Sequence, residues 1–210
     1  MPIPDRSANS HQGLSRRAFV RGSALTSAAA VMIDTASALI GTVEAKEGTL
    51  VIAPDPAPIS LRVNGVVRQV QVEPRMTLAE ALRGPLGLTG TKIACNRGAC
   101  SACTVWLDGV TVCACMMLAI EVGARNVTTI EGLATGDKLH PVQTAFIEHD
   151  ALQCGFCTPG MIMSCAALLE HKSDPTADDV NAAIGGHFCR CGTYPHVVTA
   201  TLAAASARKA

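Results

Sequence analysis

Residues 95–103 read Cys-Asn-Arg-Gly-Ala-Cys-Ser-Ala-Cys, three cysteines in the spacing C-x4-C-x2-C. This spacing is typical of plant-type [2Fe–2S] ligation, in which a fourth cysteine follows at a distance. Cys115 or Cys113 can supply the fourth thiolate, and alternation along an expected strand would put both on one face. Zinc is the alternative, but zinc-binding cysteines usually form matching C-x2–4-C pairs. The loop therefore predicts an iron–sulfur centre, with Gly98 turning the backbone so that N–H groups point toward sulfur.

A second group of cysteines lies further along the chain. Residues 153–160 read Gln-Cys-Gly-Phe-Cys-Thr-Pro-Gly, and residues 186–192 read Gly-His-Phe-Cys-Arg-Cys-Gly. A C-x2-C pair with a C-x-C pair is compatible with zinc, with a redox-active dithiol or with an iron–sulfur centre. No βαβ pattern surrounds the pair, which disfavours a thioredoxin-like dithiol. Chemistry alone favours a cluster over zinc only modestly.

The distribution of the ten cysteines also argues for metal rather than disulfides. None precedes Cys95, and all ten fall in two groups, within 95–115 and within 154–191. Neighbours this close are difficult to bridge, because a disulfide requires a specific Cα separation. The formal net charge is zero, so the chain carries no electrostatic signature of nucleic-acid or membrane-surface binding.

The first 58 residues have the features of a targeting signal and a tether. Residues 15–20 read Ser-Arg-Arg-Ala-Phe-Val, followed by a weakly apolar stretch over 22–33, which is too short for the roughly 20 residues of a membrane span. Small residues at 36–38 and 43–45 offer cleavage sites. We predict a twin-arginine signal over 1–45, a Pro-rich linker over 46–58, and a periplasmic protein exported already folded, without a stable membrane span.

The remainder of the chain predicts an α+β domain over 59–136. Apolar and polar residues alternate over 59–63 and 66–72 around Asn64-Gly65, the strongest short hairpin signal. Thr77-Leu-Ala-Glu80 fits a capping box and starts a helix. A strand over 104–107, a turn at Asp108-Gly109 and a last strand over 127–130 complete this domain.

From residue 137 to residue 210 the periodicity is helical. Pro141 and Thr158-Pro159 are expected helix starts, Thr176 is an expected N-cap, and 195–207 is a fourth expected helix. The second domain is therefore predicted to be all-α.

Together these motifs resemble the iron–sulfur subunit of the xanthine oxidase family of molybdenum hydroxylases. The resemblance covers nearly all of residues 59–207. With the arginine pair, the chain is most similar to the small subunit of bacterial periplasmic aldehyde oxidoreductases. Besides the cysteine segments it rests on G-T-K at 90–92, T-I-E-G-L at 129–133, L-H-P-V-Q at 139–143 and C-R-C-G-T-Y-P at 189–195.

The resemblance implies a β-grasp ferredoxin domain followed by a four-helix bundle, with one [2Fe–2S] cluster in each. The implied ligands of the cluster nearer the flavin are Cys95, Cys100, Cys103 and Cys115. The implied ligands of the cluster nearer the molybdenum are Cys154, Cys157, Cys189 and Cys191.

The resemblance also implies partners. Gln153 and Cys191 would lie against the pterin of a molybdenum cofactor held by a separate large subunit, and FAD would lie in a third subunit, giving a heterotrimer or its multiple. Electrons would pass from the molybdenum cofactor to the helical-domain cluster, then to the β-grasp cluster and then to FAD. No residue of this chain is expected to be catalytic.

Three positions depart from the family pattern. Ala94 and Ser101 stand where the family usually has Gly, and His187 stands where it usually has Asn. Because Ala and Ser carry a Cβ, the loop dihedrals there should be accessible to residues other than glycine. We further expect Cys165 to be a buried helical thiol. A stand-alone ferredoxin and a zinc-stabilised structural module are the two other functional hypotheses.

Overall fold

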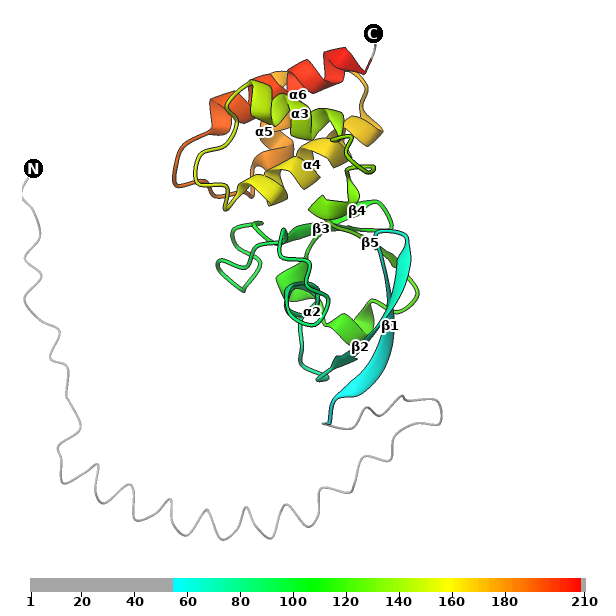
Figure 1. Cartoon of the computed structure of the whole chain (residues 1–210). Helices are drawn as coiled ribbons and strands as arrows, with labels where there is room; N and C mark the ends of the chain where they lie inside the picture. The colour runs from blue at the N-terminus through cyan, green and yellow to red at the C-terminus, as the bar shows by residue number, and fades with distance from the viewer. Residues whose placement is uncertain (1–54, 209–210) are drawn as a thin grey trace, which may run out of the picture. The chain divides into compact units, whose positions relative to one another are not determined.

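The computed structural model describes residues 55–208 (Figure 1). The predicted signal over 1–45 and most of the predicted linker lie outside these residues. Strand β1 (Ala57–Val63) begins inside the segment predicted as a linker, and Pro58 pairs with Gln71 in the first hairpin.

Two hairpins and one returning strand form a five-stranded mixed sheet. β1 pairs antiparallel with β2 (Val66–Val72), and β3 (Thr104–Leu107) pairs antiparallel with β4 (Val110–Cys113). β5 (Asn126–Thr128) lies between the hairpins, parallel to β1 and antiparallel to β3, so the order is β2-β1-β5-β3-β4.

The predicted turns explain the hairpins. Asn64 and Gly65 have φ values of 52° and 78°, and Asp108 and Gly109 have 49° and 83°. Two successive positive φ values are the geometry of the turns that match the twist of a two-residue hairpin. The last predicted strand is shorter than expected, because the chain turns into the 3-10 helix η3 (Ile130–Gly132) directly after β5.

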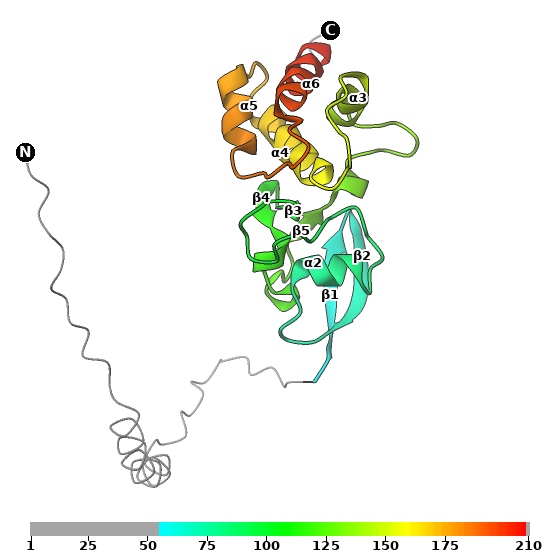
Figure 2. The same ribbon diagram turned by 90° about the vertical axis from the view of Figure 1, so that its left-hand side faces the viewer.

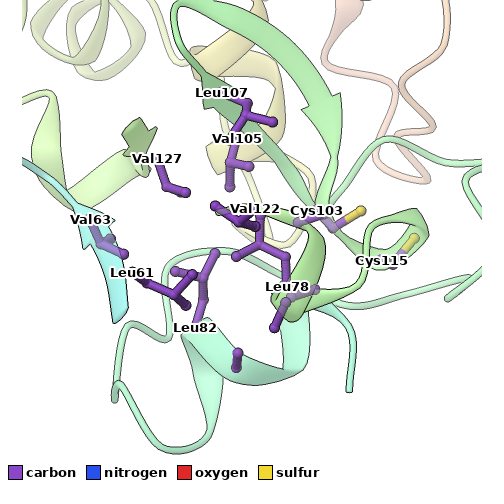
Figure 3. Close-up of a cluster of buried hydrophobic side chains, with 14 of the residues drawn as sticks. Leu61, Val63, Leu78, Leu82, Cys103, Val105, Leu107, Cys115, Val122 and Val127 are labelled. Atoms are coloured by element: carbon purple, nitrogen blue, oxygen red, sulfur yellow. The ribbon is translucent and has the colours of Figure 1, made fainter. Parts of the chain in front are cut away.

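Helix α2 (Leu78–Arg83) covers the sheet and completes the first core. Its capping box is present as predicted: Thr77 Oγ1 accepts the N–H of Glu80, and Glu80 accepts the N–H of Thr77. Figure 3 shows apolar side chains of the helix and the sheet meeting in one cluster with Val122, which directly follows the 3-10 helix η2 (Ala119–Glu121), and with Cys103 and Cys115. Two candidate ligands therefore stand at the border of the hydrophobic core.

Four helices make the second part of the chain, as predicted. They are α3 (Pro141–Glu148), α4 (Thr158–His171), α5 (Ala177–Ile184) and α6 (Tyr194–Ala207), and α4 contacts each of the other three (Figure 2). Ten of the fourteen α4 residues are buried, including Cys165, which confirms the expected helical thiol. Within residues 55–208 no helix is long and apolar enough to cross a membrane. The fold is mixed α+β, with a sheet domain followed by a helical one.

Candidate metal centres

The first cysteine loop lies between α2 and β3 and is shaped by left-handed residues. Asn96, Gly98 and Ser101 have φ values of 50°, 71° and 53°. Successive turns of this kind point backbone N–H groups toward one concave side, where they stabilise negative charge. The loop is therefore built to face an electron-rich group.

Three backbone N–H groups of this loop donate to cysteine sulfurs. Arg97 and Ala99 donate to Cys95 Sγ over 3.4 and 3.3 Å, and Gly98 donates to Cys115 Sγ over 3.3 Å. The hydrogen bond from Arg97 is the largest cause that lowers the pKa of Cys95 to about 7, followed by contact with the Cys100 thiol. Such donors favour the thiolate, which is the form that binds metal.

The other two candidate thiols of the first site also contact each other. The thiols of Cys103 and Cys115 are in hydrogen-bonding contact, and both are buried. Burial raises the pKa of Cys103 to about 12. Coordination to a cation lowers the pKa of such a buried thiol, so that its proton leaves to solvent, because the cation's charge replaces the missing solvation of the thiolate. The four thiols thus form two pairs, Cys95 with Cys100 and Cys103 with Cys115.

Cys115 and Cys113 do not lie on one strand, and the prediction that they do was wrong. β4 ends at Cys113, and Cys115 lies in the 3-10 helix η1 (Ala114–Met116), whose tighter turn takes its sulfur into the core. Cys113 is only partly buried, and its Sγ lies 4.0 Å from both Ser101 Oγ and Gly98 O. The geometry favours Cys115 as the fourth donor.

The second site joins the N-terminal end of α4 to the turn before α6. Cys154 is exposed, Cys157 is buried, and Cys189 and Cys191 are partly buried. The thiols of Cys157 and Cys189 are in contact, and burial raises the pKa of Cys157 to about 12. Proximity to the Cys154 sulfur acts in the same direction on the pKa of Cys157. The exposed side chain of Gln153 belongs to the same segment.

Two residues of this site went unassigned in the sequence, Thr193 and Tyr194. Burial acts to raise the pKa of Cys189, but hydrogen bonds from the hydroxyl and backbone of Thr193, the Cys157 thiol and the Cys191 backbone together lower it to about 7. The Tyr194 hydroxyl accepts the N–H of Cys189 and donates to His187 O, over 2.8 and 2.9 Å. Tyr194 is the single tyrosine of the chain, and its place three residues after the C-x-C pair was the available signal.

Three histidines lie at the ends of helices. His140 Nδ1 accepts the N–H of Val142 at the start of α3. His196 Nδ1 lies 3.0 Å from the carbonyl oxygen of His149, at the C-terminal end of the same helix. These contacts explain the histidines without a role in metal binding.

The donor set fits a two-iron cluster. All ten cysteines are free thiols. Over residues 55–208, no three His, Cys, Asp or Glu side chains converge in a way that could hold one metal ion. A [2Fe–2S] cluster divides its four thiolates over two irons, and the first loop presents two such pairs. The cysteines of the second site, with the Thr193 and Tyr194 hydrogen bonds, fit the same kind of group.

The two sites touch through the backbone. The N–H of Phe188, the residue before Cys189, donates to the carbonyl oxygen of Cys100 over 3.3 Å. The indole N–H of Trp106 on β3 donates to Met163 O on α4 over 2.9 Å. The sheet domain and the helical domain are therefore joined next to both cysteine loops.

A sheet domain and a helical domain, each with cysteine thiols in contact among its candidate ligands, define a two-centre iron–sulfur protein. Two family profiles match: "2Fe-2S iron-sulfur cluster binding domain" over residues 61–134 and "[2Fe-2S] binding domain" over residues 129–202. The chain carries two [2Fe–2S]-binding domains.

Individual relatives define the family more narrowly. The aldehyde oxidoreductase iron-sulfur-binding subunit PaoA of Escherichia coli K12 is 39% identical over 89% of this chain and 86% of its own length. The nicotine 6-hydroxylase small subunit of Paenarthrobacter nicotinovorans is 45% identical over 70% of this chain and 89% of its own length. Among solved structures, a chain of quinoline 2-oxidoreductase from Pseudomonas putida 86 has a TM-score of 0.71 at 41% identity, covering 74% of this chain and 97% of that one.

The chain belongs to the iron–sulfur subunits of the xanthine oxidase family, and is the iron–sulfur subunit of an oxidoreductase complex. In the aldehyde oxidoreductase of Desulfovibrio desulfuricans, the similar region is 17% of a longer chain (42% identity, 72% of this chain, TM-score 0.67).

Proposed function

We propose that this subunit relays electrons from a molybdenum cofactor in a large partner subunit, through its two [2Fe–2S] clusters, to FAD in a third subunit. The proposal extends the membership in the family to the full electron path and to a heterotrimer or its multiple. One observation carries it: the N–H of Phe188 donates to the carbonyl oxygen of Cys100 and so links the two cysteine loops. Phe188 directly precedes the candidate ligand Cys189, and Cys100 is itself a candidate ligand. A relay requires two redox sites close together, and this backbone hydrogen bond holds the two cysteine loops in contact.

In this proposal the two sites bind as the sequence predicted. Cys95, Cys100, Cys103 and Cys115 hold the cluster of a β-grasp domain over 59–136. Cys154, Cys157, Cys189 and Cys191 hold the cluster of a four-helix bundle over 137–210. When bound, each cluster would supply reversible one-electron transfer at its irons.

The residues around each cluster serve to hold and tune it. The N–H donors at 97–99 and the Thr193 hydroxyl stabilise negative charge on sulfur, and hydrogen bonds to sulfur are one of the means by which proteins set cluster potentials. Buried apolar side chains behind Cys103 and Cys115 exclude water from that side. The chain needs no acid, base or nucleophile for this task.

The outer side of the helical-domain site faces the proposed molybdenum subunit. Gln153, Phe156 and Phe188 are exposed around the second cysteine group, with Phe156 47% and Phe188 66% accessible. Exposed aromatic side chains beside polar ones are typical of protein interfaces. We place Gln153 and Cys191 against the pterin at this surface.

Metal analysis and spectroscopy test the clusters. We expect four irons per chain, two for each [2Fe–2S] domain, with matching acid-labile sulfide and two distinct EPR signals on reduction. A preparation that contains only zinc would contradict the proposal.

Co-purification tests the partners. Co-expression with the neighbouring genes should give a complex that contains molybdenum and flavin and reduces a dye with aldehydes or N-heterocycles. A lone monomer without either cofactor would favour the stand-alone ferredoxin instead.

The export proposal has its own test. We propose a periplasmic location reached by the twin-arginine route, supported by the arginine pair at residues 16 and 17. Replacing both arginines by lysine should retain the folded, cluster-loaded protein in the cytoplasm. Unchanged recovery from the periplasm would argue against this route.

A further inference from the structure

The two cysteine loops approach each other with almost no side chain between them. A Cβ placed on Gly160, in the first turn of α4, would lie 2.4 Å from the carbonyl oxygen of Ser101 and 3.3 Å from the Cα of Ala102. A Cβ placed on Gly186 would lie 3.2 Å from Ser101 Oγ. The loop of the sheet domain therefore packs directly on the glycine backbone of the helical domain.

All of these contacts involve residues within three positions of a candidate ligand. Ser101 and Ala102 lie between Cys100 and Cys103, and Gly160 is three residues beyond Cys157. Because a short, packed segment moves as a unit, the distance between these backbones determines the distance between the sulfurs attached to them.

The Ser101 carbonyl cannot turn away to make room for a side chain at position 160. It accepts hydrogen bonds from both the backbone N–H and the hydroxyl of Thr104, over 3.2 and 2.7 Å. An added methyl group would have to push back a hydrogen-bonded carbonyl rather than a flexible side-chain end. The close approach therefore depends on the absence of a side chain at Gly160.

A second contact holds the two domains at this separation. Trp106 lies three residues after Cys103 on β3, and its indole N–H donates to the carbonyl oxygen of Met163, three residues after Gly160 on α4. Met163 is fully buried, so this anchor is protected from competing water. The indole hydrogen bond and the glycine contact act on the same helix within one turn of each other.

We propose that Gly160 is a positioning residue for electron transfer between the two centres: it allows α4 to seat against residues 101–102, and the Trp106–Met163 hydrogen bond keeps it there. This inference rests on the proposed relay function. Electron tunnelling weakens steeply with distance, so a small separation of the loops slows transfer without changing either cluster.

The test compares Gly160→Ala with the unaltered chain in the cluster-loaded complex. The readouts are the magnetic interaction between the two reduced clusters, seen as splitting in the EPR spectrum, and the rate of electron transfer between them. We expect unchanged iron content, unchanged g values for each cluster, a smaller splitting and a transfer rate at least several-fold lower. A merely structural role for Gly160 would leave the splitting unchanged.

Gly185→Ala is the matched control. Gly185 ends α5 with φ −57° and ψ −23°, and an added Cβ would meet only the carbonyl oxygens of its own helix turn. We expect this variant to behave as the unaltered protein in both readouts.

Trp106→Phe is the second variant, because it keeps an aromatic ring and removes only the indole hydrogen bond. We expect a smaller decrease in both the EPR splitting and the transfer rate. If Gly160→Ala does not assemble both centres, the result for Trp106→Phe alone decides the inference. An unchanged splitting and rate in every variant that retains both clusters would overturn the inference while leaving the relay function intact. Absence of two cluster signals in the unaltered chain would instead refute the proposed function.

Discussion

The hydroxyl oxygen of Ser164 on α4 lies 2.7 Å from Nε2 of His187, and both side chains are buried. Burial lowers the pKa of His187 to about 4, so the ring is neutral at physiological pH. The other ring nitrogen, Nδ1, is buried without a hydrogen-bond partner within the described residues. The Ser164 hydroxyl is therefore the polar contact that the buried His187 ring retains. His187 itself stands where the family usually has Asn.

Ser164→Ala should destabilise the chain by roughly 1–3 kcal/mol, the usual cost of leaving a buried polar group unsatisfied. The measurement is the shift of the urea midpoint at which the visible absorption of the clusters is lost. Ser206→Ala is the control, because that hydroxyl is exposed and bonds only to a carbonyl of its own helix. Equal midpoints for the two variants would contradict the role given to Ser164.

Gly98→Ala should impair the first centre. The residue has φ 71°, and a left-handed Ala costs about 1–2 kcal/mol. An added Cβ would also lie 2.9 Å from Met116 Cγ, but that exposed side chain can move, so backbone strain and displacement of the N–H that bonds Cys115 dominate. We expect lower cluster occupancy, measured by visible absorption and EPR of the first centre.

Gly109→Ala is the control for Gly98→Ala. Its φ of 83° imposes comparable backbone strain, but no atom lies within 4 Å of its added Cβ and it stands in the β3–β4 turn. It should lower stability and leave cluster occupancy unchanged. Loss of the first EPR signal in both variants would show that strain alone, rather than the sulfur contact, is responsible.

Substitution of the two neighbouring cysteines should separate ligand from bystander. Cys115→Ser should abolish or strongly alter the first cluster signal, because Cys115 is buried against Cys103 and receives the Gly98 N–H. Cys113→Ser should retain it, because its sulfur lies 4.0 Å from its nearest polar contacts, in a partly exposed position. The reverse pattern in iron content and EPR would identify Cys113 as the ligand.

Ser101→Gly should slightly stabilise the cluster loop. Ser101 has φ 53°, in the small left-handed region that a residue with a Cβ can reach at a cost, whereas Ala94 is not among the residues with positive φ. Relief of left-handed strain, less the greater freedom of glycine in the unfolded chain, leaves a gain on the order of 0.5 kcal/mol. The stability of the variants is compared by urea titration. Ser101→Ala removes the same hydroxyl and keeps the strain, so a gain in stability for that variant would contradict the explanation.

Stability should fall with acidification in part through His140. Burial, followed by the nearby Arg208 cation, lowers the pKa of His140 below its ordinary value of 6.5, and its Nδ1 caps α3 only while unprotonated. The unfolded chain then binds more protons below pH 6.5, so this contribution is complete above pH 6.5 and is lost as the pH falls toward the folded-state pKa. His140→Asn retains a good cap without titrating in this range and should give a shallower loss of stability between pH 7 and pH 5. Equal slopes for both proteins would rule this contribution out.

Much of the local structure could be predicted from residues close together in the chain. The Asn64-Gly65 and Asp108-Gly109 turns, the Thr77 capping box and the starts of α3 and α4 depend on the conformational preferences of two to four neighbouring residues. Candidate ligands could be predicted within each cysteine segment for the same reason, whereas the pairing of residues 154–157 with residues 189–191 was implied only by the resemblance to the family. The end of β4 was misjudged because a strand and a 3-10 turn differ by contacts with the core rather than by composition.

By itself the amino-acid sequence predicted which segments carry metal-binding cysteines and determined which segments form hairpins and helices, because spacing and turn chemistry are local. Only the tertiary structure decided that Cys115 rather than Cys113 turns inward, that Thr193 and Tyr194 hold the second site, and that the two cysteine loops meet. The meeting depends on contacts such as Trp106 with Met163, 57 residues apart, and Cys100 with Phe188. Pairings over such separations follow from how two packed cores fit together, and no pattern within either segment encodes that fit.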